Sequence, residues 1–107
     1  MLYKFKSKAA GDLIMLEPNG RRVLEIIGKD PGPTGIILPS QMAPAVAALE
    51  QAIACEEAEQ KAAVEEARAA GQDPPKFEAI GLRQRAVPFI DMLRHCEQAN
   101  REIVWGV

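Results

Sequence analysis

Apolar and polar residues alternate at the start of the chain, and apolar residues return near its end. In residues 2–7, Leu-Tyr-Lys-Phe-Lys-Ser, the aromatic side chains fall on one face and the lysines on the other, as in a half-buried strand. Residues 101–107 are β-branched and aromatic, which predicts a terminal strand over about residues 102–106. We expect the two strands to pair in one sheet and Trp105 to be at least half buried.

Three stretches between these strands repeat apolar residues at the spacing of amphipathic helices. They cover residues 18–27, which Gly28 would terminate, residues 41–55 and residues 79–99. Pro88 interrupts the third stretch, so that helix either begins near residue 87 or is kinked there. The apolar stripes are Val23, Leu24, Ile26 and Ile27; Met42, Val46, Leu49 and Ile53; and Leu82, Ala86, Phe89, Ile90 and Leu93.

Turn residues mark the connections, and two segments fit more than one structure. Residues 9–11, Ala-Ala-Gly, predict a turn, and residues 12–16 then fit either a short capped helix or a short buried strand. Residues 29–35 contain two Pro and two Gly and predict a loop. Residues 36–38 fit a very short strand or an extended approach to the next helix.

Residues 56–76 differ from the rest because they have no apolar stripe. Val64 is their only large apolar residue between Glu56 and Lys76, among many alanines, six acids and three bases. Ala, Glu, Gln and Lys favour helix, so we expect a solvated helical arm and linker. The whole chain, residues 1–107, is predicted to be one α+β domain. Its small sheet would include both terminal strands and pack against two or three amphipathic helices.

Charge and composition narrow the classes of function. The chain has 107 residues, with 13 Lys and Arg against 15 Asp and Glu, so a dedicated nucleic-acid binder is not expected. No apolar stretch is long enough to span a membrane, and residues 1–8 lack the apolar core of a signal peptide. We therefore expect a cytoplasmic protein in which Cys55 and Cys96 are reduced thiols.

Arginines are the strongest candidates for a binding site. Two arginines lie near the start of one predicted helix and two near the start of another, and Arg94 follows on the latter. If the two helices pack side by side, their guanidinium groups would converge on a phosphate or carboxylate. The competing interpretation is that each is a solvated surface residue or pairs with an acid such as Glu25, Glu78 or Asp91. The candidate anion-binding residues are Arg21, Arg22, Arg83 and Arg85.

No motif predicts catalysis, a metal or a cofactor. His95 and Cys96 are neighbours on a predicted helix and point about 100° apart, so they cannot act as a base and nucleophile. Asp91 and His95 are spaced to form half of a metal site that a second chain would complete. We expect instead that Asp91 is an acid on the helix beside a partly exposed histidine. Cys55 is expected in the core or at its boundary. The carboxylate pair Glu56-Glu57 falls in the predicted arm, where nothing is expected to perturb its pKa values.

Six blocks of the sequence look familiar when taken in order: residues 1–7, 14–16, 24–29, 35–37, 82–89 and 103–107. Together they resemble a family of short proteobacterial proteins catalogued as a domain of unknown function. The resemblance spans nearly the whole chain, with residues 56–76 the least distinctive. It implies a bacterial intracellular protein and assigns no role to any residue.

Two hypotheses on function follow from these patterns. The first is a non-enzymatic interaction module that forms a homodimer. Its interface would use the faces of helices 41–55 and 79–99, or else a strand edge such as that of residues 103–107. The second is a small anion- or nucleotide-binding regulatory protein that uses the clustered arginines.

Overall fold

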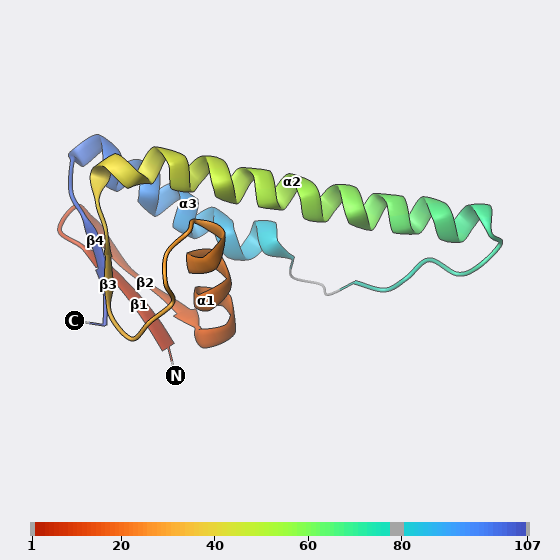
Figure 1. Ribbon diagram of the computed structural model, residues 1–107, viewed down its shortest axis with the longest axis horizontal. Helices are drawn as coiled ribbons and strands as arrows, with labels where there is room; N and C mark the ends of the chain where they lie inside the picture. The colour runs from red at the N-terminus through yellow and green to blue at the C-terminus, as the bar shows by residue number, and fades with distance from the viewer. Residues whose placement is uncertain (1, 78–80, 107) are drawn as a thin grey trace.

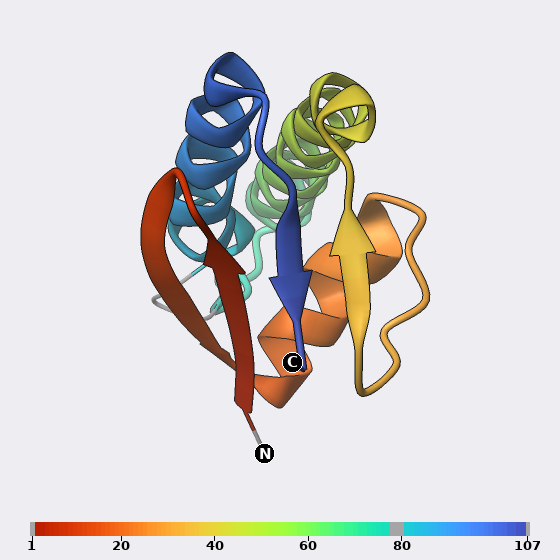
Figure 2. The same cartoon turned by 90° about the vertical axis from the view of Figure 1, so that its left-hand side faces the viewer.

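The computed structural model describes residues 2–77 and 81–106, and these residues form one α+β fold. The strands make a single antiparallel sheet, and the helices lie against one of its faces (Figure 1, Figure 2). The predicted fold class is therefore confirmed. In chain order the elements are β1 (Leu2–Ser7), β2 (Ala10–Leu16), α1 (Glu17–Ile26), β3 (Gly35–Ile37), α2 (Pro39–Ala69), α3 (Leu82–Ala99) and β4 (Ile103–Trp105).

The two terminal strands lie side by side in the middle of the sheet, whose order is β2-β1-β4-β3. Phe5 of β1 is opposite Trp105 of β4, and Lys6 is opposite Val104. This confirms the predicted pairing of the two ends of the chain. Because β3 pairs with the other side of β4, the expectation that β4 offers an open strand edge is wrong.

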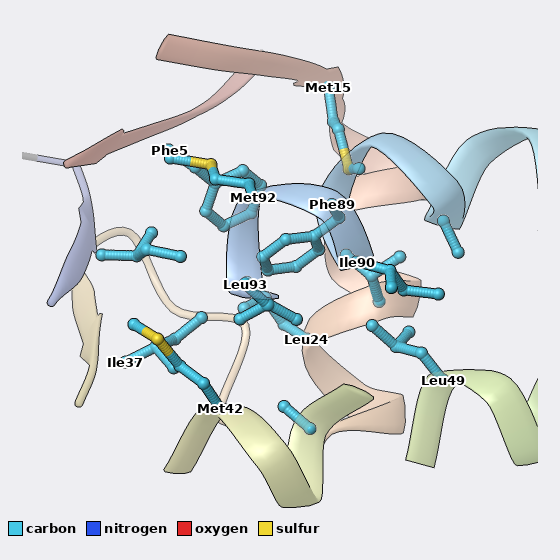
Figure 3. Packing of buried hydrophobic residues seen from close by; sticks show 14 of the residues in the cluster. Phe5, Met15, Leu24, Ile37, Met42, Leu49, Phe89, Ile90, Met92 and Leu93 are labelled. Carbon is cyan, nitrogen blue, oxygen red and sulfur yellow. The ribbon is translucent and has the colours of Figure 1, made fainter. Parts of the chain in front are cut away.

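The core lies between the inner face of the sheet and the three helices (Figure 3). Phe5 of β1 stacks on Phe89 of α3 with ring centroids 4.7 Å apart, and the rings of Phe5 and Trp105 pack at a steep angle with centroids 6.0 Å apart. Only 2% of Trp105 is exposed, as its predicted burial required. Leu24 of α1 and Leu93 of α3 are fully buried in the same cluster, so every layer contributes to one core.

Two aromatic side chains fasten the loop before β3 to the sheet. The Tyr3 hydroxyl donates to the carbonyl of Pro31 at 2.7 Å, and the Trp105 indole N–H donates to the carbonyl of Gly32 at 3.1 Å. The Trp105 ring also covers Gly35, where an added Cβ would lie 2.0 Å from it. The predicted loop is thus held in place by hydrogen bonds from the core.

The segment that the sequence left open at residues 12–16 belongs to β2 and is a strand. The turn before it lies at Lys8 and Ala9, so the turn predicted at residues 9–11 begins one residue too late. The Ser7 hydroxyl accepts a hydrogen bond from the Ala9 N–H at 3.2 Å, which closes this short turn. The segment before α2 likewise contains a strand, β3.

α1 confirms the helix predicted over residues 18–27 and its end at Gly28. The N–H of Gly28 donates to the carbonyl of Glu25 at 3.1 Å, and the N–H of Lys29 donates to that of Leu24 at 2.8 Å. These two bonds form a Schellman motif, which needs a left-handed residue, and Gly28 has φ of +82°.

α3 runs without a break through Pro88, so the alternative that it begins near residue 87 is wrong. Leu82 before the proline and Phe89 after it are both buried. Packing on both sides therefore holds the helix together despite the missing N–H. The predicted start at residues 79–80 lies outside the described residues.

α2 is one continuous helix that extends well beyond the sheet, and it gives the molecule a long axis of 53 Å (Figure 1). Its buried residues are Met42, Ala45, Leu49 and Ile53. From Glu56 onward none of its residues is buried, and the helix ends at Ala69. Among the described residues, no helix is both long and apolar enough to cross a membrane.

Candidate functional site

The glutamate Glu56 joins all three helices at the point where α2 leaves the body of the protein. Its Oε2 accepts a hydrogen bond from the backbone N–H of Leu82, the first residue of α3, at 2.9 Å. Its Oε1 accepts one from Arg22 of α1 at 3.2 Å. A carboxylate is favourable here because the N-terminus of a helix carries partial positive charge and unpaired N–H groups. Glu56 therefore caps α3 from a neighbouring helix.

The next residue, Glu57, forms a two-bond ion pair with Arg83 of α3. Arg83 donates from Nε to Oε2 and from Nη2 to Oε1 of Glu57, both at 2.8 Å. These hydrogen bonds, helped by the charge of the guanidinium, lower the pKa of Glu57 and raise the pKa of Arg83. The expectation that nothing perturbs this carboxylate pair is therefore wrong for Glu57, because α3 returns alongside α2 at this point.

The four candidate arginines occupy three places. Arg22 and Arg83 come together on the consecutive carboxylates at the start of α3. Arg21 instead pairs within α1 with Glu17, at 3.6 Å and one turn away. Arg85 lies beside β2, in a hollow that Pro88 and residues 13–16 also line. Arg22 and Arg83 are thus held at adjacent residues of α2, each by a different carboxylate of the chain itself.

A shallow hollow of about 320 Å³ lies along the surface between α2 and α3. Ile53, Val87 and Ile90 form its apolar part. The rim is ionic, with Arg94 paired to Glu50 near one end of the hollow. Arg83, which also lines the hollow, pairs with Glu57.

His95 and Cys96 point in different directions, as their spacing predicted. His95 is exposed and Cys96 is fully buried. Within residues 2–77 and 81–106, no three His, Cys, Asp or Glu side chains are grouped so that they could hold a metal ion. Cys55 is exposed, so its expected place in the core is wrong. It lies one turn after Gln51, which donates to its sulfur at 3.6 Å on the outer side of α2.

No helix covers the outer face of the sheet (Figure 2). Most of the exposed large apolar side chains of the described residues lie on this face. Leu2 of β1 lies opposite Leu16 of β2, and Lys4 lies opposite Ile14. Lys4 also forms an ion pair with Asp12 at 3.4 Å. Of the seven exposed large apolar side chains among the described residues, four belong to this outer face: Leu2, Ile14, Leu16 and Ile36.

The distant partners explain which part of this site the sequence did not predict. Arg22 is 34 residues from Glu56, and Arg83 is 26 residues from Glu57. Glu25 and Asp91, two of the named acids, are not the partners of Arg22 and Arg83, and Glu78 lies outside the described residues. Only the folded arrangement of α1, α2 and α3 shows which carboxylate meets which guanidinium. The exposed residues of the strands could be recognised in the sequence as apolar. The face on which Ile14 and Leu16 lie, however, depended on whether residues 12–16 form a strand.

The fold and the site define a small α+β domain in which Arg22 and Arg83 are bound by carboxylates of the chain itself. In the described part of the chain, no buried side-chain nitrogen or oxygen lacks a hydrogen-bond partner. Residues 1–105 match the family described as Domain of unknown function (DUF1840), and the chain belongs to this family. No curated protein and no solved structure matches the chain. Functional conclusions must therefore come from the surfaces of the molecule itself.

Proposed function

We propose that this domain is a non-enzymatic interaction module that works as a homodimer. The observation that carries the proposal is the outer face of the sheet, where Leu2, Ile14 and Leu16 are each more than half exposed. Large apolar side chains gathered on one open face are typical of a surface that binds another protein. A twofold homodimer is the simplest partner, since it joins one patch to its own copy.

The ionic groups support the same proposal. Arg22 and Arg83 are engaged by Glu56 and Glu57, and these contacts join the helices to one another. This arrangement is typical of a structural role, because each charge is used to position an element of the fold. The exposed free thiol of Cys55 fits a reducing compartment, and we infer the cytoplasm as the site of action.

The alternative function, binding of an anion or a nucleotide by Arg21, Arg22, Arg83 and Arg85, has less support. For Arg22 or Arg83 to bind an external phosphate, each would first have to release its own carboxylate. Such a site would show binding of inorganic phosphate or a nucleotide that weakens with salt. Isothermal titration with each of these two probes distinguishes the alternative from the proposal.

Sedimentation equilibrium tests the proposed homodimer. The full chain is measured over a hundredfold concentration range that spans the micromolar region. We expect the average mass to rise from one chain toward two. A mass of one chain at every concentration would contradict the homodimer and weaken the interpretation as an interaction module.

A further inference from the structure

The two edges of the sheet differ in how well they are protected against pairing with another strand. An edge strand presents unpaired N–H and C=O groups, and proteins blunt such edges with short strands, proline or lysine. β3 is only three residues long and lies between Pro33 and Pro39. β2, the other edge, is seven residues long, contains neither proline nor lysine, and has Asp12 as its one charge.

β2 also has the sequence of an interior strand. Residues 13–16, Leu-Ile-Met-Leu, are apolar on both faces, a pattern typical of strands that are covered on all sides. Met15 faces the core and is buried, and Leu13 on the same face is only partly covered. On the other face, Ile14 is 56% exposed and Leu16 is 60% exposed. No other described part of the chain covers Ile14 and Leu16 on the outer face.

The helices leave this edge accessible. A hollow of about 240 Å³ runs beside β2 and is lined by residues 13–16 together with Asn19, Arg85 and Pro88. Since the hollow lies between the strand and α3, the side chains of α3 do not close over the edge. A further strand can be added to the sheet here, as in β-augmentation.

We propose that β2 pairs with β2 of a second copy, antiparallel about a twofold axis, so that the two sheets become one. The inference rests on the proposed function and identifies the surface that would form the dimer. A strand that is apolar on both faces is matched by a strand of the same pattern. Leu13 would then meet an apolar side chain of the second copy on the inner face, and one of Ile14 and Leu16 would do so on the outer face, depending on the register.

The charge pattern of β2 suits this arrangement. Opposite residues of an antiparallel pair lie on the same face, so the twofold axis passes through a residue. With the axis at Leu13, Asp12 faces Ile14 of the second copy, and with the axis at Ile14 it faces Leu16. In both registers the two Asp12 carboxylates avoid each other, because Asp12 lies toward one end of the strand. An interface based on one short strand is small, so we expect a dissociation constant in the range of about 1–100 μM.

Single acidic substitutions on the full chain test the proposal by sedimentation. Ile14→Glu places a negative charge opposite Asp12 of the second copy with the axis at Leu13, or opposite its own copy with the axis at Ile14, and should raise the dissociation constant of the dimer by about tenfold or more. Two matched controls each place a glutamate at an exposed apolar residue elsewhere: Ile36→Glu on β3 and Val87→Glu on α3. Both controls should leave the dissociation constant within about twofold of the wild type. If Ile14→Glu fails to fold, Leu16→Glu replaces it, with Trp105 fluorescence as the check for native structure.

Hydrogen exchange adds a readout that is specific for strand pairing. Raising the protein concentration should slow the exchange of alternate amides in residues 10–16, those that point away from β1. If the wild type dimerises but Val87→Glu dissociates it and Ile14→Glu does not, the β2 surface is wrong and the homodimer stands. A dimer in which these amides gain no protection also shows that the β2 surface is wrong, while the homodimer stands. A wild type that stays at one chain overturns both proposals, and leaves the edge to a strand of another protein.

Discussion

The two halves of α2 belong to one uninterrupted helix, yet they are stabilised in different ways. The sheet-proximal part, residues 39–55, buries Met42, Leu49 and Ile53 against the sheet and α3. The distal part, residues 58–69, has no buried residue. At a burial free energy of about 25 cal/mol per Å², the proximal part gains stability from the core and the distal part gains almost none.

The distal part is helical because its residues favour helix locally. Alanine and glutamate cost little in a helix, and the helix is already nucleated by the packed turns that precede it. The change from one regime to the other falls at Glu56 and Glu57, which bind α1 and α3. The continuous helix α2 thus consists of two regions of different stability.

Removing the central aromatic should break the packed region most severely. Trp105→Ala deletes a side chain that is 2% exposed and that also donates to the loop carbonyl of Gly32. We expect a loss of about 3–5 kcal/mol in the free energy of unfolding, the usual cost of a large core truncation. Urea unfolding followed by circular dichroism measures it. A loss below about 1 kcal/mol would show that Trp105 is not part of the core.

Adding a methyl group at Gly35 should have the next largest effect on stability. Gly35→Ala places a Cβ 2.0 Å from the buried Trp105 ring, so the ring or the strand must move. Overpacking of this kind costs about 1–3 kcal/mol. Gly11→Ala in β2 is the matched control, since a Cβ there has no atom within 4 Å, and it should change stability by less than about 0.5 kcal/mol. Equal effects of the two substitutions would contradict the close contact.

Removing most of the arm should lower the free energy of unfolding by less than the largest loss expected for either Trp105→Ala or Gly35→Ala. We expect deletion of residues 58–75, closed with a short Gly/Ser loop, to leave a folded protein within about 1–2 kcal/mol of the parent. The blue-shifted, iodide-shielded emission of Trp105 should be unchanged. An insoluble or molten deletion variant would show that the arm packs against the body or a second copy.

The smallest expected effect is at the junction between the two parts of α2. The Arg83 hydrogen bonds lower the pKa of Glu57 in the folded state, so the pair stabilises the fold above the pKa of an unfolded glutamate, about 4.3. This contribution is lost as the pH falls through the lowered folded value. In the Glu57→Gln variant, the free energy of unfolding should therefore fall slightly less steeply as the pH drops below about 4. Glu65→Gln, in the distal part of the same helix, is the control and should leave the profile unchanged.

The regular elements of the fold could be predicted because their patterns are local. The alternation in residues 2–7 and the apolar stripe of residues 82–93 each identify an element and the face it buries. Residues 12–16 could not be assigned, since four adjacent apolar residues carry no period. Their place at the sheet edge then depended on where β4 paired, which is a long-range contact.

The candidate site was predictable only in part for the same reason. The sequence predicted that arginines on two helices would converge on an anion or else pair with acids, and Arg22 and Arg83 each pair with an acid. It did not indicate that these acids would be Glu56 and Glu57, because those residues lie in a segment whose composition is that of a solvated arm. The role of Glu56 as a cap for α3 depends on the return of the chain after residue 77.

Hydrogen exchange along α2 tests most directly the claim that one helix holds two regions of different stability. Amides of the proximal part should exchange only through opening of the whole body, and those of residues 60–69 through local fraying. We predict a difference in protection of at least about a hundredfold, with the change close to Glu57. Protection that continues undiminished to Ala69 would contradict the account, because it would show that the distal part is also packed.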